Sequence, residues 1–379
     1  MRSYFGAGAM LLQLGASLAV YGRLARHARS PRLRYAPAPD DEACLPPVAV
    51  VIPVLNEAKR LGPCLAALRE CRRPVARIVV VDTGSHDGTP DLVRAAMSAD
   101  ARIRLVEAGA PPPWWANGKA WGLRCALDSV ETAWVLMTDA DVRLGPRAPA
   151  RLLATALASN CGVLSAAPRM TVRGPLAALH AAMLASLLFR VGLPGTVARR
   201  EGEVLANGQA MLARSELLCS EELWRLAARS RCEDVTIART LHAAGVRVGS
   251  VEATDIEVAM YDSVADAWRN WPRSLALRDG LTRPAPWNGL GAATAVQALP
   301  LTLLVAIARR RDGNAARAAA LFLIALRFAV GLGVARTYPN GRGWAALAPL
   351  ADLPVALRLW HAALARRHRW RGRLLAEVV

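Results

Sequence analysis

Short apolar stretches of strand type alternate with stretches of helix type between residues 48 and 138. The strand-like stretches run from Val48 to Val54, Arg77 to Asp82, Arg102 to Glu107 and Trp134 to Thr138. The helix-like stretches between them are the face formed by Leu61, Cys64, Leu65, Leu68 and Cys71, then Asp91 to Met97 and Lys119 to Asp128. This alternation predicts an α/β fold, with a parallel sheet covered by helices on both faces. Because ligands bind beyond the carboxyl ends of such strands, the polar residues there form the candidate site.

The charge of the chain is strongly positive and unevenly placed. The 379 residues are 54% hydrophobic and carry a net charge of +18, nearly all from arginine. The arginines gather beside apolar stretches, at Arg23 to Arg34, Arg309 to Arg311 and Arg366 to Arg373. Such flanks are typical of segments that lie on anionic lipid headgroups. Since no nucleic-acid-binding motif accompanies them, we expect a membrane partner and no nucleic acid.

The seven cysteines are an odd number without zinc-ligand spacing. They predict small apolar side chains in a reducing compartment rather than disulfides or a metal centre.

The N-terminal stretch from Phe5 to Val20 has no charged residue. One arginine precedes it, several follow it, and no small-residue cleavage site clearly comes after it. We therefore expect an uncleaved membrane anchor over residues 1–24. The positive-inside rule then places the following domain in the cytosol, at the inner (cytoplasmic) membrane.

Three further apolar stretches follow Pro286, which predicts a multi-pass protein. They are Gly289 to Ala308, Ala318 to Ala335 and Trp344 to Ala365, and the last is the weakest because it contains two charged residues. Three crossings would leave the arginine loop 309–311 outside, against the positive-inside rule. If the stretch from Gly289 to Ala308 is re-entrant or interfacial, that loop stays inside. The lengths of the three apolar stretches favour three crossings.

Polar residues follow the first two predicted strands. Pro53, Asn56 and Glu57 end the first strand, where an amide and a carboxylate can hold a ribose or a base edge. The same residues are also typical of a turn and a helix start. Asp82 ends the second strand, where its carboxylate could accept a hydrogen bond from a nucleobase. Three residues after it have turn and capping character: Ser85, Asp87 and Gly88.

Asp139 and Asp141 follow the fourth predicted strand and are the sharpest feature of the sequence. A bend there would bring both carboxylates to one divalent cation, which would bridge a diphosphate and neutralise the charge of the leaving group. Lys119, one of only two lysines, stands at a helix start where a compact cation could meet that diphosphate. A solvated helix-start lysine is the alternative.

Three more groups of residues are candidates, the first two of them on the acceptor side. Gln209 lies in the short polar turn 207–209 before an apolar stretch. Glu233 and Asp234 open a helix, where acids complement the dipole without any further role or where one of them could deprotonate an acceptor hydroxyl. Arg273 ends a Trp- and Arg-rich stretch from Trp268, which is typical of a membrane interface or could meet the phosphates of the donor.

Taken in order, these motifs resemble glycosyltransferase family 2. The set comprises P-x-x-N-E at Pro53 to Glu57, V-D-T-G-S-x-D-G-T at Val81 to Thr89, G-K at Gly118, D-A-D at Asp139 and E-D at Glu233. The membrane layout, the W-x-x-G-K-x-W pattern from Trp115 and the stretch from Met260 to Leu275 resemble the hopanoid-biosynthesis-associated glycosyltransferases within it. Carotenoid-type lipid glycosyltransferases share the layout.

The resemblance implies a GT-A fold, the Rossmann-like fold of nucleotide-diphospho-sugar transferases. Such a domain would cover residues 45–265, followed by a membrane-interface segment at 266–285 and a transmembrane region at 286–379. It further implies inversion at the anomeric carbon, a nucleotide-sugar donor that is often UDP-linked, Mg²⁺ or Mn²⁺, and here a lipid acceptor such as a hopanoid or another isoprenoid.

The resemblance also implies roles for individual residues. Glu57 and Asp82 would hold the nucleoside, Asp139 and Asp141 the metal and diphosphate, and Asp234 would be the general base.

Two departures from the family pattern bear on these roles. Thr83 stands where many members have a second Asp, so the nucleoside contacts can differ. The Q-x-x-R-W motif of processive synthases is absent, which favours transfer of a single sugar.

Two other functions compete with this one. A sugar nucleotidyltransferase would share the sheet, but the glycine-rich loop expected after its first strand is missing. A catalytically silent membrane scaffold would not need Asp139, Asp141 and Asp234.

Overall fold

An eight-stranded sheet forms the centre of the protein in the computed structural model, which describes residues 2–275, 285–300, 304–305, 307, 314–365, 367–370 and 373–376. The strand order is β3-β2-β1-β4-β7-β6-β8-β5. The strands are β1 (Val48–Val54), β2 (Val75–Asp82), β3 (Ile103–Glu107), β4 (Trp134–Thr138), β5 (Val142–Leu144), β6 (Val163–Met170), β7 (Ala210–Arg214) and β8 (Val248–Val258). All seven residues of β1 are buried, as expected for a central strand covered on both faces.

The sheet is mixed. The prediction of a parallel sheet is right for the four strands on which it was made, and the sheet continues beyond β4 with strands of both directions. β1 to β4 are parallel neighbours, but β7 runs antiparallel to β4 and to β6, and β5 runs antiparallel to β8. The parallel half was recognisable because a helix follows each of its first three strands. β7 instead enters the sheet beside β4 from a distant part of the chain, a pairing that no local pattern encodes.

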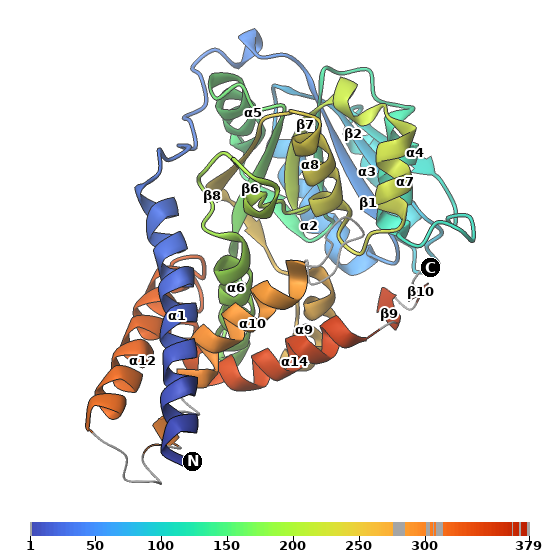
Figure 1. Ribbon diagram of the computed structural model, residues 1–379. Helices are drawn as coiled ribbons and strands as arrows, with labels where there is room; N and C mark the ends of the chain where they lie inside the picture. The colour runs from blue at the N-terminus through green and yellow to red at the C-terminus, as the bar shows by residue number, and fades with distance from the viewer. Residues whose placement is uncertain are drawn as a thin grey trace.

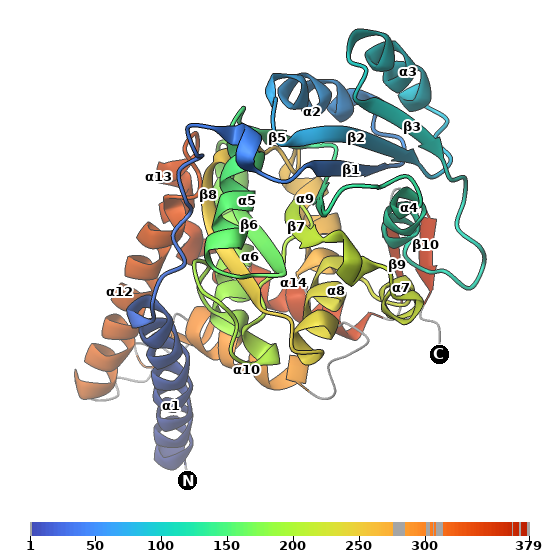
Figure 2. The same cartoon turned by 90° about the horizontal axis from the view of Figure 1, so that it is seen from above.

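Helices cover both faces of the sheet (Figures 1 and 2). On one side, α2 (Ala58–Glu70), α3 (Thr89–Ala99) and α5 (Ala148–Ala158) pack on the strands; on the other side lie α4 (Gly118–Leu127), α7 (Glu221–Ala228) and α8 (Glu233–Ala243). The predicted helical face of α2 is confirmed, because Leu61, Cys64, Leu65 and Leu68 are all buried. The α/β fold class is therefore confirmed.

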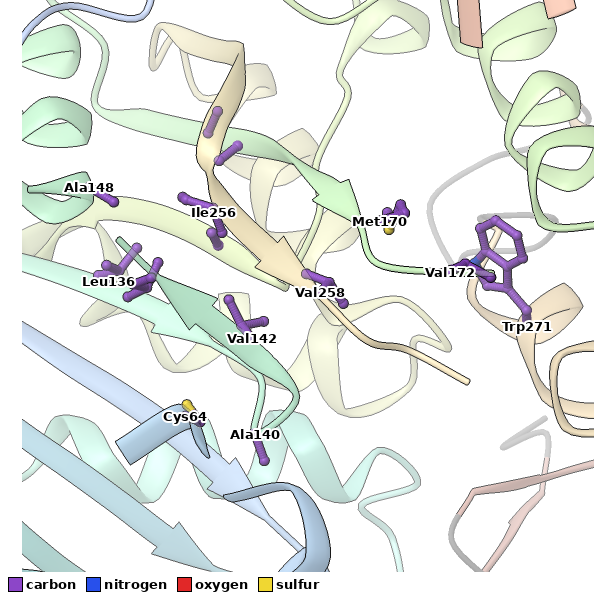
Figure 3. Close-up of a cluster of buried hydrophobic side chains, with 14 of the residues drawn as sticks. Cys64, Leu136, Ala140, Val142, Ala148, Met170, Val172, Ile256, Val258 and Trp271 are labelled. Atoms are coloured by element: carbon purple, nitrogen blue, oxygen red, sulfur yellow. The ribbon is translucent and has the colours of Figure 1, made fainter. Parts of the chain in front are cut away.

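The hydrophobic core continues from the sheet toward the strand ends where the site lies. Figure 3 shows Cys64, Ala140 and Val142 close together beyond β4, and Trp271 beside Val172 after β6. Trp271 belongs to the short 3-10 helix η4 (Trp271–Ser274), which follows α9 (Val264–Asn270). The core thereby fixes the backbone on which the polar residues of the site stand.

A second group of helices extends away from the sheet (Figure 1). It contains α1 (Arg2–Arg29), α6 (Pro175–Val191), α10 (Ala285–Gln297), α12 (Asn314–Ala335), α13 (Arg342–Ala346) and α14 (Asp352–Leu364). α1 packs on α10 and α6, and α12 packs on α6 and α13. A short hairpin, β9 (Arg367–Trp370) with β10 (Arg373–Ala376), follows α14.

The predicted membrane-spanning helices are not confirmed. Among the described helices, α12 is the one that is long and apolar enough to cross a membrane, in agreement with the predicted span from Ala318 to Ala335. The predicted N-terminal segment forms the helix α1, which continues past residue 24 through the arginines to Arg29. The predicted span from Gly289 to Ala308 lies partly outside the described residues, and its described helix α10 has 13 residues.

The predicted span from Trp344 to Ala365 is wrong as a single helix. The chain there forms α13, the 3-10 helix η5 (Ala348–Ala351) and then α14, which has 13 residues. Pro349 lies at the break; proline has no backbone N–H and cannot continue a helical hydrogen-bond ladder. Multiple crossings are therefore not established by the described residues.

One buried ion pair joins the C-terminal helices. The Arg327 guanidinium on α12 donates to both carboxylate oxygens of Asp352, at 2.7 and 2.8 Å, and Gln297 of α10 donates to the same carboxylate at 3.1 Å. Arg327 and Asp352 are each 2% exposed. Charges this deeply buried need such pairing, so α10, α12 and α14 are tied to one another.

Candidate active site

The candidate site is a cavity of about 1120 Å³ at the carboxyl ends of β1 and β4. Most of the predicted site residues line it: Pro53, Glu57, Lys119, Asp139, Asp141, Gln209, Glu233 and Asp234. They come from five separate segments of the chain, which the sheet brings together. The predicted residues therefore gather at the strand ends, as expected from the fold. The role of each residue stays a prediction.

Lys119 stands between two carboxylates. Its Nζ lies 2.7 Å from Asp139 Oδ1 and 2.9 Å from Glu233 Oε1. The sequence predicted a lysine that meets a diphosphate, and the alternative was a solvated helix-start lysine. The side chain is instead 17% exposed and links the end of β4 to the start of α8. It remains next to Asp139, where a diphosphate would lie.

Asn117 holds this arrangement in place and was not among the predicted site residues. Its Oδ1 caps α4 by accepting hydrogen bonds from the N–H groups of Lys119 and Ala120, at 3.0 and 3.1 Å. Its Nδ2 donates to Glu233 Oε2 at 3.0 Å and to the carbonyl of Ser230 at 2.9 Å. The sequence signal was an asparagine directly before a helix, which indicates a cap but not the second contact.

Glu233 and Asp234 point to different partners, as expected for adjacent residues in a helix. Glu233 turns to Lys119 and Asn117, whereas Asp234 Oδ2 accepts from the backbone N–H of Gly208 at 2.6 Å. Asp234 Oδ1 accepts from the N–H of Val235 at 2.8 Å. Asp234 is thus the carboxylate of α8 that faces the turn before β7.

The turn 207–209 is fixed by the neighbouring strands. Thr138 Oγ1 donates to the carbonyl of Gln209 at 2.7 Å, and Asn207 Nδ2 donates to Gln209 Oε1 at 2.9 Å. Since Thr138 pairs with Ala210 across β4 and β7, Asp139 comes to lie beside this turn. The antiparallel strand that the sequence did not reveal therefore joins the predicted donor side to the predicted acceptor side.

The charges of this cluster shift one another's pKa. Burial would lower the pKa of Lys119, but Asp139, Glu233 and Asp234 raise it well above its usual value. Burial would raise the pKa of Glu233, but Lys119 and the hydrogen bond from Asn117 keep it below its usual value. Burial and repulsion from Glu233 raise the pKa of Asp234 to about 6, against the attraction of Lys119. Asp234 is therefore the carboxylate of α8 that titrates near neutral pH.

Asp139 and Asp141 both line the cavity, on either side of the buried Ala140. Among the described residues, no group of three or more His, Cys, Asp or Glu side chains is placed to hold a metal ion. Two carboxylates nevertheless fit a hard cation that shares its coordination with a diphosphate and water. The donor set therefore suits an ion bound together with a nucleotide, rather than one held by protein ligands alone.

Two predicted nucleoside ligands make their contacts within the protein. Asp82 is 5% exposed, and its carboxylate accepts from the N–H groups of Gly84 and Ser85 at 3.0 Å each. Asn56 has φ of 55°, and its Oδ1 accepts from the N–H of His86 at 2.9 Å. Both residues shape the loop after β2 rather than lining the cavity, so their contact with a nucleoside stays a prediction.

The remaining predictions near the site have separate outcomes. The capping role of Asp87 is confirmed, since its carboxylate accepts from the N–H groups of Ala58 and Thr89. Gly88 caps α3 with φ of 84°, a left-handed conformation that favours glycine. Arg273 lies in η4, but its side chain is outside the described part of the structure.

Comparison with known proteins identifies the class to which this fold and site belong. The model of the family described as "Glycosyltransferase like family 2" matches residues 46–277. The chain therefore belongs to this family of glycosyltransferases, and the predicted enzyme class is confirmed. This match also removes the support for a sugar nucleotidyltransferase.

Individual relatives match shorter parts. The lipopolysaccharide core biosynthesis glycosyltransferase LpsC of Rhizobium meliloti is 38% identical over 98 residues, which are 26% of this chain and 33% of that protein. Glycosyltransferase AglE of Haloferax volcanii is 42% identical over 64 residues, 16% of this chain and 21% of that protein. The chain thus spans a third or less of the length of these relatives.

The solved structure of the mannosyltransferase PcManGT from Pyrobaculum calidifontis, in complex with GDP-Man and Mn²⁺, matches with a TM-score of 0.56. The match covers 93% of this chain and 99% of that one at 24% identity. A likeness at this identity shows the fold alone, and it confirms the GT-A fold. The hopanoid-specific resemblance is not among the similarities found.

The contact of Gly208 with the charge cluster gives a test of the site. A Cβ at position 208 would lie 2.7 Å from Lys119 Nζ and 3.3 Å from Asp234 Oδ2. Since both ion pairs hold Lys119, Gly208→Ala should displace it and lower transfer roughly ten- to a hundredfold without unfolding the protein. Gly202→Ala is the matched control, because nothing lies within 4 Å of its Cβ. Steady-state kinetics and a thermal melt measure both effects; a fully active Gly208→Ala enzyme would contradict the assignment.

Proposed function

We propose that this enzyme transfers a single sugar, with inversion and with a divalent cation, from a UDP-linked sugar donor to a membrane lipid of the hopanoid or another isoprenoid class. The observation that carries the proposal is the two-sided composition of the cavity. One part holds Lys119 and the carboxylates, and another part is lined by apolar residues of three helices: Leu24, Ala25 and Ala28 of α1, Leu184, Leu187 and Leu188 of α6, and Val330 and Val334 of α12. A lipid with a polar head and an apolar tail fits such a cavity.

The outer faces of α1 and α12 support a membrane location. Large apolar side chains point outward there: Leu11, Leu12, Leu18, Leu321, Phe322 and Leu332 are between 54% and 75% exposed. The inward face of α1 instead carries the buried Gln13 and Ser17, and that of α12 carries Arg327. Polar residues inside and apolar residues outside are typical of helices surrounded by lipid. The sidedness of the domain stays a prediction from the arginines.

The donor and the cation are inferred from the site and from a solved structure with a similar fold. The mannosyltransferase with this fold holds GDP-Man and Mn²⁺. Here Asp139 and Asp141 would hold Mg²⁺ or Mn²⁺, which would neutralise the developing charge of the departing diphosphate. Lys119 stands beside Asp139 and adds a fixed positive charge on the same side. Glu57 and Pro53 line the part of the cavity next to β1, where the nucleoside would lie.

In this proposal Asp234 acts as the base. Inversion is a single displacement, in which the acceptor oxygen attacks the anomeric carbon as the nucleotide diphosphate leaves from the opposite face. A carboxylate can take the hydroxyl proton while the new bond forms. The N–H groups of Gly208 and Val235 orient the carboxylate of Asp234, whereas Glu233 is engaged by Lys119.

Asp139→Ala and Asp141→Ala should each abolish transfer and the metal dependence of donor binding while the protein still folds. The reason is that these two carboxylates are the proposed ligands of the cation, so each variant would leave it one protein ligand. Isothermal titration of a UDP-sugar with and without Mn²⁺ measures the effect. Unchanged metal dependence in both variants would mean that the metal binds elsewhere. If the unmodified protein does not hydrolyse the donor, a catalytically silent scaffold would be favoured instead.

Asp234→Asn should lower turnover by about two to four orders of magnitude while donor affinity stays nearly unchanged. In the unmodified enzyme, kcat/KM should fall as the pH drops through about 6, because a protonated Asp234 cannot accept the proton. Pre-steady-state kinetics across pH would show both effects. Loss of activity in Glu233→Gln alone, with Asp234→Asn active, would reverse the two roles.

Leu187→Gln should weaken use of the lipid acceptor and leave donor hydrolysis unchanged. Leu187 lines the apolar part of the cavity, and a buried amide without a partner would disfavour an apolar tail there. Leu157→Gln on α5 is the matched control, because Leu157 is 43% exposed and lies outside the cavity. We expect KM for a polyprenyl or hopanoid acceptor to rise several-fold only in Leu187→Gln. An equal response of both variants would rule out an apolar acceptor path.

A further inference from the structure

A second cavity, of about 960 Å³, lies on the other side of α1 from the catalytic cavity. Four segments form it: the last turns of α1, the residues just after them, the loop 196–200 and the connection from α8 to β8. Its charged and titratable lining is nearly all basic, with six arginines and two histidines against the single acid Glu203: Arg23, Arg26, Arg32, Arg199, Arg200, Arg247, His27 and His242. Arg32 is the one residue of this set that also lines the catalytic cavity.

Most of these arginines have no acidic partner of their own. Arg32 pairs with Glu252 at 2.8 Å, and Arg23 donates to the carbonyl of Phe189. For the other four (Arg26, Arg199, Arg200 and Arg247) the described part of the chain provides no carboxylate within ion-pair distance, and all four are exposed. Glu203 accepts from the backbone N–H of Arg199 at 3.2 Å and lies 4.0 Å from His27 Nε2, and it pairs with none of these four guanidinium groups.

Such a concentration of unneutralised charge costs energy through mutual repulsion unless an anion relieves it. The four side chains come from three separate segments of the chain, which the fold brings around one cavity. Arginine suits phosphate in particular, because its planar guanidinium can donate two parallel hydrogen bonds to phosphate oxygens. The cavity therefore has the composition of a site for a phosphate group.

The position of the cavity relative to the apolar faces points to the source of the phosphate. Leu18 of α1 is 75% exposed, and Arg26 follows it by eight residues on the same helix. At 1.5 Å per residue the separation is roughly 12 Å along the helix axis. If Leu18 lies in the hydrocarbon of a bilayer, Arg26 and the loop 196–200 lie at the depth of the lipid headgroups.

We propose that this second cavity binds the headgroup phosphate of an anionic membrane lipid. The proposal rests on the membrane location proposed above, but it concerns a site separate from the catalytic one. α1 would present Leu24, Ala25 and Ala28 to the acceptor on one side and Arg23 and Arg26 to a lipid phosphate on the other. The bound headgroup would hold the catalytic domain at a fixed height above the bilayer, with the apolar part of its cavity toward the lipid.

The test measures lipid retention by the full-length protein, with no transfer step involved. The protein purified in detergent is mixed with phosphatidylglycerol, and the bound lipid is counted by native mass spectrometry. Three Arg→Gln changes together, at Arg199, Arg200 and Arg247, should weaken retention about a hundredfold, because each arginine near an anionic surface contributes about a fivefold gain in affinity. The matched control carries Arg→Gln at Arg69, Arg72 and Arg104, which are exposed and lie around α2 and β3, away from α1 (Figure 2). It loses the same charge and should change retention by less than threefold.

Three results would overturn the proposal. Equal weakening in both triple variants would mean general attraction by net charge. Equal retention of phosphatidylcholine would mean that the headgroup charge is not recognised. Displacement of phosphatidylglycerol by an equal concentration of inorganic phosphate would mean a site for a soluble anion.

If the triple variant does not fold, the unmodified protein can be crosslinked with a photoreactive phosphatidylglycerol instead. Crosslinks should fall within residues 196–203 and 242–247, and crosslinks confined to other segments would refute the site. Since neither readout involves sugar transfer, a failure here is distinguishable from a failure of the proposed reaction.

Discussion

The ion pairs of Lys119 are the interaction on which the active site depends. Asp139, Glu233 and Asp234 gather at the end of the sheet, and carboxylates so close together would repel one another in a low-dielectric cavity. The single ammonium group between Asp139 and Glu233 compensates this repulsion. It also distinguishes the two acids of α8. The pKa of Glu233 is lowered by its pairing with Lys119, whereas that of Asp234, which lines the cavity, is raised. Asn117 makes this arrangement rigid, because it caps the helix that carries the lysine and binds the carboxylate that the lysine pairs with.

The sequence revealed the parts of the fold in which local pattern and tertiary structure agree. β1 and β4 lie where they were predicted, and the helical face of α2 is buried as expected. Strand ends of an α/β sheet meet at one edge, so motifs after separate strands could be assigned to one site before any contact was known. The resemblance to a family then gave those motifs their chemistry.

Other features depend on contacts between distant segments and were beyond reach of the sequence. The pairing of β7 with β4 places Gly208 against Asp234, although 26 residues separate them along the chain. Asp82 and Asn56 have the residue types of ligands, yet their polar atoms are used to hold a loop. The length of the apolar stretch from Trp344 suggested one helix, and Pro349 divides it. In each case the residue types fitted more than one structure, and contacts between distant segments determined which one forms.

The buried pair of Arg327 and Asp352 has a consequence for the stability of the C-terminal helices. Arg327 lies in the middle of the apolar helix α12, and its partner stands 25 residues later, beyond the break at Pro349. Without that later segment α12 would bury a charge that lacks this carboxylate, and breaking a buried ion pair costs about 3–5 kcal/mol. The stable packing of α12 therefore depends on α14, and that of α14 on α12. A chain cut before Asp352 would leave Arg327 without this partner, so its C-terminal helices should pack less stably.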